Sequence, residues 1–92
     1  MTDILQRTLS VSSHAVESAV GDETVILHLK NGTYYGLDPV GTRIWAMIKE
    51  GLAIPDICRR LADQYAVELT TIEADARKFL TDLEAQGILV DG

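Results

Sequence analysis

Few side chains in this chain are suited to covalent chemistry, and the single cysteine is Cys58. Arg59 and Arg60 follow it, and neighbouring positive charges lower the pKa of a thiol. A nucleophilic cysteine also needs a base, and neither histidine of the chain is suitably placed to act as one. We therefore expect a thiol that packs in the core or at an interface, in a protein without disulfides from a reducing compartment.

The remaining chemistry-bearing side chains also favour binding over catalysis. His14 and His28 fall on neighbouring predicted strands but on opposite faces, so we expect no shared metal site. Acidic pairs such as Asp22 with Glu23 fall on turns or exposed helix faces, where solvated charges are usual. No glycine-rich loop precedes a helix as a phosphate site requires. The sequence thus predicts no catalytic residue, metal or cofactor, and a protein that is not an enzyme.

The size and charge of the chain restrict its partners. Its 92 residues fit one domain, spanning residues 1–92. Its 14 acidic and 8 basic side chains give a net charge of -6, which opposes binding to nucleic acid or anionic lipid. The first residues lack a secretory signal pattern, and no apolar run is long enough to span a membrane. We expect a soluble cytoplasmic protein with neither a nucleic acid nor a membrane as its partner.

Two turn signals divide the first forty residues into strands. Gly21-Asp22 and Asn31-Gly32 each suit a two-residue hairpin loop, and Asn-Gly tolerates the positive φ that a type I′ turn requires. They predict an antiparallel meander of residues 14–20, 23–30 and 33–37. Residues 1–13 are harder to assign, although Leu9 and Val11 suit an extension of the first strand.

Two-residue loops fix which side chains share a face of this sheet, because faces alternate along a strand. They place Leu29 opposite Tyr34 and His28 opposite Tyr35. The face predicted to meet the core carries Val16, Val20, Val25, Leu27, Leu29 and Tyr34. The other face carries Glu17, Thr24, Ile26, His28, Tyr35 and Leu37. A slip of one residue would exchange Tyr34 and Tyr35, so their orientation stays open.

From residue 38 onward the apolar residues recur with a helical period. Asp38 suits an N-cap with Pro39 at the first helical position, and Gly51 is expected to end this helix. Pro55 suits the first turn of a second helix.

A third and longer helix completes the predicted fold. Thr70 and Glu73 have the spacing of a capping box at its start, and Gly87 suits the position after its end. Residues 88–90 form an apolar tail, either a short strand or core filler. The order of elements predicts an α+β fold, in which a three-stranded antiparallel sheet is followed by three helices.

The last predicted strand, residues 33–37, lies at an edge of the meander and therefore exposes unpaired backbone groups. It contains no charge, proline or bulge signal that would prevent pairing, so it can accept a further strand. If the third helix borders this edge, the far wall of the groove consists of Ala74, Arg77, Lys78 and Thr81. In the alternative interpretation, residues 1–13 cover the edge.

The last two helices also suit a helix-turn-helix with a β-wing, which is the layout of many DNA-binding domains. The charges of the chain, however, oppose DNA binding. The third helix would be the recognition helix, and it carries four acidic residues against Arg77 and Lys78. Acidic residues near its start would meet phosphates with the wrong sign. A winged-helix architecture without DNA binding fits better.

Several segments carry a family resemblance, above all the run from Tyr34 through Asp38 and the run from Val40 through Trp45. Residues 23–27, 54–65 and 73–89 continue it. Over roughly residues 14–90, the chain resembles the PqqD-like family, also known as the RiPP precursor peptide recognition element.

The resemblance implies a winged helix-turn-helix fold and a binding function. Members of the family bind the leader segment of a ribosomally made precursor peptide and present its core segment to modifying enzymes. The leader adds as a strand to the third strand, beside the third helix. Carried over by position, the peptide-binding residues are Thr33, Tyr34, Tyr35, Gly36, Leu37, Ala74, Arg77, Lys78 and Thr81.

Within the family, the Tyr34 to Trp45 run is most similar to the free-standing leader-binding proteins of lasso peptide biosynthesis. That branch implies a leader peptidase and an ATP-dependent cyclase as partners. A peptide receptor with a free sheet edge is also expected to be a monomer alone. One alternative is a PqqD-type peptide chaperone for a radical S-adenosylmethionine enzyme. Another is a non-catalytic winged-helix subunit that regulates or oligomerises through its sheet edge.

Overall fold

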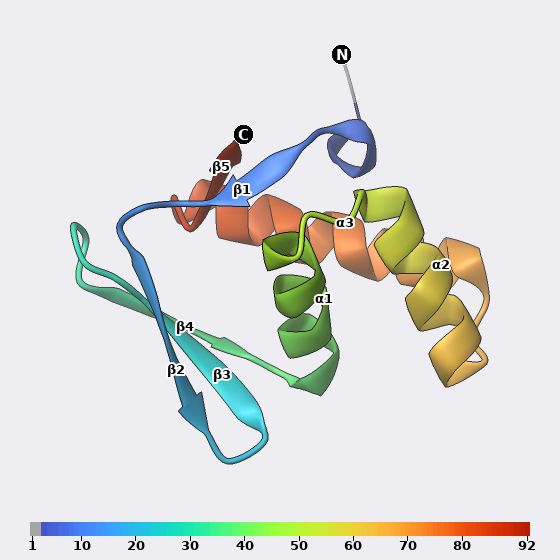
Figure 1. The fold of residues 1–92 in the computed structure, drawn as a ribbon, viewed down its shortest axis with the longest axis horizontal. Coiled ribbons are helices and arrows are strands. Elements are labelled where there is room, and N and C mark those ends of the chain that lie inside the picture. The colour runs from blue at the N-terminus through green and yellow to red at the C-terminus, as the bar shows by residue number, and fades with distance from the viewer. Residues whose placement is uncertain (1–2) are drawn as a thin grey trace.

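A computed structural model describes residues 3–92 and shows an α+β fold, as the sequence predicts (Figure 1). Strands β2–β4 form a meander on one side of the molecule, and three helices gather on the other. Short elements at both ends of the chain complete the fold. The elements are η1 (Ile4–Gln6), β1 (Leu9–Val11), β2 (Ala15–Val20), β3 (Glu23–His28), β4 (Thr33–Leu37), α1 (Pro39–Lys49), α2 (Ile54–Tyr65), α3 (Leu69–Ala85) and β5 (Leu89–Asp91).

The N-terminal segment packs on the helices and lies away from the meander. Strand β1 pairs with β5, with Val11 opposite Leu89, and both ends of the chain thus share a two-stranded sheet. Ile4 and Leu5 are buried where η1 packs on α2 and α3. The suggested extension of the first strand by Leu9 and Val11 is therefore wrong, because these residues pair with the C-terminal strand instead.

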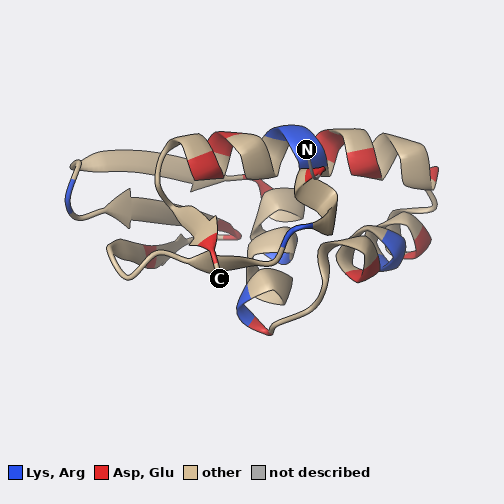
Figure 2. Cartoon of the chain, turned by 90° about the horizontal axis from the view of Figure 1, so that it is seen from above, with Lys and Arg blue, Asp and Glu red and all other residues tan. Residues whose placement is uncertain are grey.

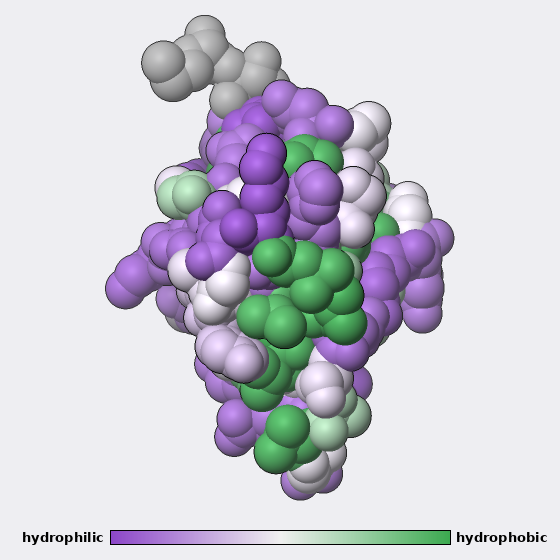
Figure 3. Space-filling view, turned by 90° about the vertical axis from the view of Figure 1, so that its left-hand side faces the viewer, coloured by the Kyte–Doolittle hydropathy of each residue, from purple (hydrophilic) through white to green (hydrophobic). Residues whose placement is uncertain are grey.

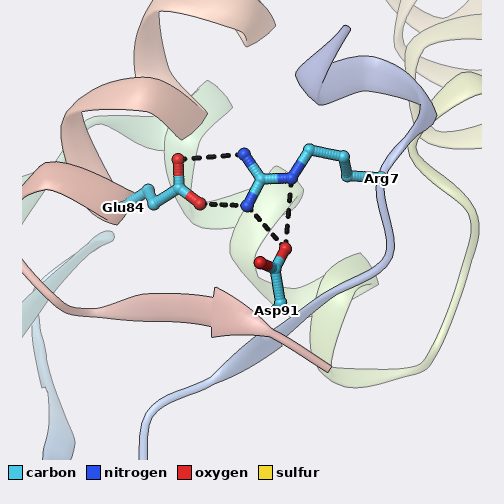
Figure 4. Close-up of polar contacts among 3 residues, drawn as sticks. All are labelled: Arg7, Glu84 and Asp91. Atoms are coloured by element: carbon cyan, nitrogen blue, oxygen red, sulfur yellow. Dashed lines mark hydrogen bonds and ion pairs between the residues drawn. The ribbon is translucent and has the colours of Figure 1, made fainter. Parts of the chain in front are cut away.

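Arg7 fixes this arrangement through two carboxylates (Figure 4). Its guanidinium Nη1 donates to Glu84 Oε1 on α3 at 3.1 Å, and its Nε donates to Asp91 Oδ1 at the end of β5 at 3.1 Å. Charge-assisted hydrogen bonds of this forked kind give both direction and attraction. The N-terminal segment is thereby attached to the helix and to the strand that follows it.

The predicted pairing of the first two strands of the meander is confirmed, with Val20 opposite Glu23. The β3–β4 register is shifted by two residues from the predicted one, so that Ile26 lies opposite Tyr35. The cause is a loop of four residues, 29–32, in place of two. The Gly32 N–H donates to the His28 carbonyl oxygen at 2.8 Å, and the Asn31 N–H donates to His28 Nδ1 at 3.2 Å.

A shift of two residues preserves the two faces, but the face predicted to meet the core is the wrong one. The helices cover the face that carries Ile26 and Leu37, which are 0% and 1% exposed. Thr24 and His28 are buried on the same face, and α1 packs against β3 and β4 there. The buried His28 ring is hydrogen-bonded on this face, because its Nδ1 accepts from the Asn31 N–H.

The opposite face of the sheet remains an apolar surface. Val16, Val20, Leu29 and Tyr34 are all exposed on it. Figure 3 looks onto the side of the molecule where the sheet lies and shows the apolar side chains gathered in a patch. Counting apolar residues favoured this face as the core face, yet it meets solvent.

The helix starts follow the predictions at α1 and α2. The Asp38 carboxylate caps α1 by accepting from the Gly41 N–H at 2.6 Å, and Pro39 and Pro55 occupy the first turns of α1 and α2. The predicted capping box of α3 is wrong, because this helix begins at Leu69 without a side-chain cap.

The end of α3 lies where the sequence predicts it. Gly87 follows α3 with a φ of +74°, a left-handed conformation that glycine adopts at low cost and that was predicted for this position. Among residues 3–92, every helix is too short or too polar to cross a bilayer.

Candidate functional site

The outer edge of β4 carries the unpaired backbone groups that the sequence predicts. The sheet order is β2-β3-β4, and in residues 3–92 no strand pairs with the far side of β4. The Leu29 N–H donates to the His14 carbonyl, so alternate residues of β3 from Leu29 backwards bond to β2. The residues between them bond to β4. By the same alternation, Tyr34 and Gly36 direct their N–H and C=O groups to the free edge.

Tyr35 connects this edge to α3. Its side chain is half-buried, whereas Tyr34 on the outer face is 74% exposed. Burial raises the pKa of the Tyr35 hydroxyl, and the nearby carboxylates of Asp82 on α3 and Asp38 before α1 raise it further. Tyr35 is thus the tyrosine that faces the helices, which resolves the orientation left open by the sequence.

A cavity of about 200 Å³ lies just beyond the end of β4, next to Asp38. Its floor is apolar and consists largely of buried side chains, and Asp38 and Asp75 are exposed at its margin. The cavity lies between the start of α1, α2 and the first half of α3. The lining residues are Asp38, Val40, Gly41, Ile44, Leu61, Ile72, Asp75, Ala76 and Phe79.

Three residues of α3 that the sequence analysis left out belong to this groove. Asp75 and Phe79 line the cavity, and Asp82 faces Tyr35. Their spacing of four and three residues puts them on one face of the helix. That spacing was a usable signal, but it becomes informative only when the side of α3 beside β4 is known.

The predicted wall residues of α3 are exposed, but they do not share one environment. Ala74, Lys78 and Thr81 are free of the core. Arg77 is paired with Asp3 of the N-terminal segment, with Nη2 to Oδ2 at 2.7 Å and Nε to Oδ1 at 3.1 Å. Two residues along a helix correspond to a rotation of about 200°, so Arg77 lies on the side of α3 opposite Asp75.

The cysteine and the histidines lie apart from the groove. Cys58 is 0% exposed, and burial, together with the nearby Glu73 carboxylate, raises the pKa of its thiol, which opposes thiolate chemistry. The His14 and His28 rings are 5.8 Å apart, so the prediction that they lie on opposite faces is wrong. His14 precedes β2, where strand alternation no longer fixes its side chain. Among the described residues, no three His, Cys, Asp or Glu side chains are grouped as metal ligands.

Comparison with known proteins places this geometry in a family. The family model described as coenzyme PQQ synthesis protein D (PqqD) matches residues 23–89, which include β4, the cavity and α3. The chain belongs to the PqqD family. As a PqqD family member, it has the winged three-stranded sheet and three helices that the resemblance implied. A search of curated proteins finds no match.

Two solved structures are similar to the chain. One is TbiB1 in complex with the TbiA(β) leader peptide, with 40% identity, a TM-score of 0.82, and coverage of 87% of this chain and 93% of TbiB1. The other is a lasso peptide synthetase B1 complexed with a leader peptide, with 22% identity and a TM-score of 0.84, covering 90% and 98%. The second likeness shows the fold alone, and both cover nearly the whole chain.

Proposed function

We propose that this PqqD family member binds the leader segment of a lasso precursor peptide as a fourth strand on β4. The observation that carries the proposal is the free edge at Tyr34 and Gly36, beside which Tyr35 faces Asp82 of α3. TbiB1, which is 40% identical, was solved in complex with a leader peptide, and this supports a peptide as the occupant.

Strand addition supplies alignment, and the groove supplies most of the affinity. Ordering a flexible segment costs about 2–5 kcal/mol, so backbone pairing with β4 is not sufficient. Alternate side chains of the added strand point inward, towards Tyr35 and the cavity at Phe79. Burial of these side chains provides the remaining free energy.

The bound leader then brings the core segment of the precursor to its enzymes. Tethering raises the local concentration of the core segment at a leader peptidase and at a cyclase of the same pathway. The protein itself acts without catalysis, as a cytoplasmic peptide-binding partner. Leader binding is supported by the leader complex of TbiB1, and the lasso branch is favoured by the similarity of the Tyr34 to Trp45 run.

The proposed binding residues include all five of β4, Thr33–Leu37. On α3, Asp75, Phe79 and Asp82 form the inner wall, and Ala74, Lys78 and Thr81 form its outer margin. Arg77 was also predicted as a contact, but we propose that it holds the N-terminal segment instead, because it pairs with Asp3 on the side of α3 opposite Asp75.

The test uses the free N–H of Gly36. Gly36→Pro removes this donor from the open edge without removing a bond to β3, and proline is tolerated at such edge positions. Gly36→Ala is the matched control, because a Cβ at this position meets nothing within 4 Å. We expect wild type and Gly36→Ala to bind the TbiA(β) leader peptide in a fluorescence-polarisation titration. The Kd of Gly36→Pro for the same peptide should be at least tenfold higher than that of wild type. Equal binding by a folded Gly36→Pro protein would contradict strand addition at this edge.

A further inference from the structure

The basic residues of the chain are distributed unevenly around the groove. Ion pairs engage Arg7, Lys49, Arg59 and Arg77, each with a carboxylate outside the groove. Figure 2 shows acidic segments on both sides of a basic one along α3. The carboxylates of the groove are therefore distinct from the carboxylates that these ion pairs neutralise.

Three carboxylates surround the groove without an ionic partner. Asp38 and Asp75 lie at the margin of the cavity, and Asp82 faces the Tyr35 hydroxyl. Within residues 3–92, none of these three forms an ion pair, although Lys78 lies between Asp75 and Asp82 along α3. Lys78 is three residues after Asp75 and four before Asp82, so it offsets part of this charge, and the groove keeps a net negative charge. On the opposite side of α3, Arg7 and Arg77 neutralise their neighbours.

The cavity combines this charge with an apolar floor. Val40 and Phe79 are partly buried at the opening, and Ile44, Leu61 and Ile72 are buried beneath them. A Lys or Arg side chain has a matching construction, because its methylene stem packs on apolar surface while its charged end stays at the margin. Attraction between such a charge and a carboxylate is stronger in a partly dehydrated groove than in bulk water.

We propose that the groove selects leaders with a Lys or Arg residue, whose stem lies over Val40 and Phe79 and whose charge lies between Asp38 and Asp75. This inference rests on the proposed function and specifies the chemistry of the peptide recognised. The position of the cavity beyond Leu37 places that residue just past the part of the leader that pairs with β4. A purely apolar or aromatic anchor in the same cavity is the competing outcome.

The test is a substitution scan of the TbiA(β) leader peptide. Each position is replaced singly by Lys, by Met of similar length without charge, or by Glu, and the Kd is measured by fluorescence polarisation. We expect one or two positions at which Lys binds about threefold or more tighter than Met and Glu binds weaker than both. Raising the salt from about 50 mM to 300 mM should reduce the advantage of Lys.

Two protein variants separate the groove from the overall charge. Asp75→Asn should abolish the advantage of Lys at those positions, because it removes the charge while keeping the shape. Asp63→Asn on α2 is the matched control, since it makes the same change in net charge at an exposed site that is absent from the cavity lining, and it should preserve the advantage.

The outcomes distinguish this inference from the function on which it rests. Binding with Met equal to or better than Lys at every position overturns the selection of a cation but leaves leader binding intact. An equal gain from Lys at all positions, reduced alike by Asp63→Asn and Asp75→Asn, also overturns it, because the effect then comes from net charge. Failure of wild-type protein to bind any peptide of the scan overturns leader recognition itself.

Discussion

The Arg77 guanidinium on α3 donates two hydrogen bonds, of 2.7 Å and 3.1 Å, to the carboxylate of Asp3, which precedes η1. The contact attaches one side of α3 to the N-terminal segment, whereas the buried side chains of Ile72, Leu80 and Leu83 orient the helix on the core. The side with Asp75, Phe79 and Asp82 is then left for the groove. Arg77, which the sequence predicts as a peptide contact, thus already has an ionic partner within the protein.

Replacing Arg77 tests this structural role. Arg77→Gln should change the Kd for the TbiA(β) leader peptide by less than about twofold, because the side chain points away from the groove. It should lower the urea midpoint of unfolding at pH 7. The pairing lowers the pKa of Asp3, so the stabilisation is complete above the usual Asp pKa and is lost as the pH falls through the lowered one.

The pH profile makes this prediction specific. Wild type and Arg77→Gln should converge in urea midpoint once the pH falls below the lowered pKa of Asp3, where its carboxylate becomes protonated. Asp3→Asn should reproduce the effect of Arg77→Gln, and the double variant should add little to either. A tenfold loss of peptide affinity in Arg77→Gln, with Asp3→Asn unaffected, would instead place Arg77 among the peptide contacts.

The two tyrosines of β4 should differ sharply in binding. Tyr35 points towards Asp82 and the groove, and Tyr34 is 74% exposed on the outer face. Tyr35→Ala should weaken leader binding about tenfold or more, because it removes a half-buried aromatic side chain from the groove. Tyr34→Ala keeps the backbone groups of the free edge and should stay within about twofold of wild type. The reverse order of effects would show that the leader packs on the outer face.

Cys58 should be dispensable for binding. Its side chain is 0% exposed and its thiol pKa is raised by burial, so native protein should react with iodoacetamide much more slowly than urea-unfolded protein. Cys58→Ala should keep the Kd for the leader peptide while lowering the free energy of unfolding by about 1 kcal/mol, through the lost sulfur contacts. Rapid alkylation of the folded protein, or loss of pathway activity without loss of binding, would reopen a chemical role for this thiol.

Local signals accounted for most elements of the fold, because short-range chemistry decides them. Asp38 with Pro39 fixes the start of α1, and Gly87 ends α3 with a positive φ. The open edge at β4 followed from strand order and from the absence of charge or proline in Thr33–Leu37. Each of these depends on residues close together in the chain.

Features that depend on tertiary packing were predicted less well. The sheet face with more apolar residues is exposed, because α1 covers the face that carries Ile26 and Leu37. The inner wall of the groove depends on which side of α3 faces β4, and the opposite side carries Arg77, which pairs with Asp3 across 74 residues of sequence. No local pattern specifies such a contact. The family resemblance located the strand and the helix, but not the side of the helix that faces the peptide.

The exposed apolar face makes the oligomeric state a decisive test between the proposed function and an oligomerising subunit. Val20, Leu29 and Tyr34 are more than half exposed there, which favours association, whereas a net charge of -6 opposes it. Leader recognition needs the β4 edge to be free. We therefore expect light scattering to give the monomer mass of 10.1 kDa over about a hundredfold range of concentration.

Two variants identify the surface if the mass rises with concentration. A dimer abolished by Gly36→Pro pairs through the β4 edge, and would support a subunit that oligomerises there in place of binding a leader. A dimer abolished by Leu29→Ser but not by Gly36→Pro packs through the outer face, which leaves the edge free for a peptide. The leader peptide discriminates between these arrangements directly, because it should dissociate only the dimer that occupies the edge.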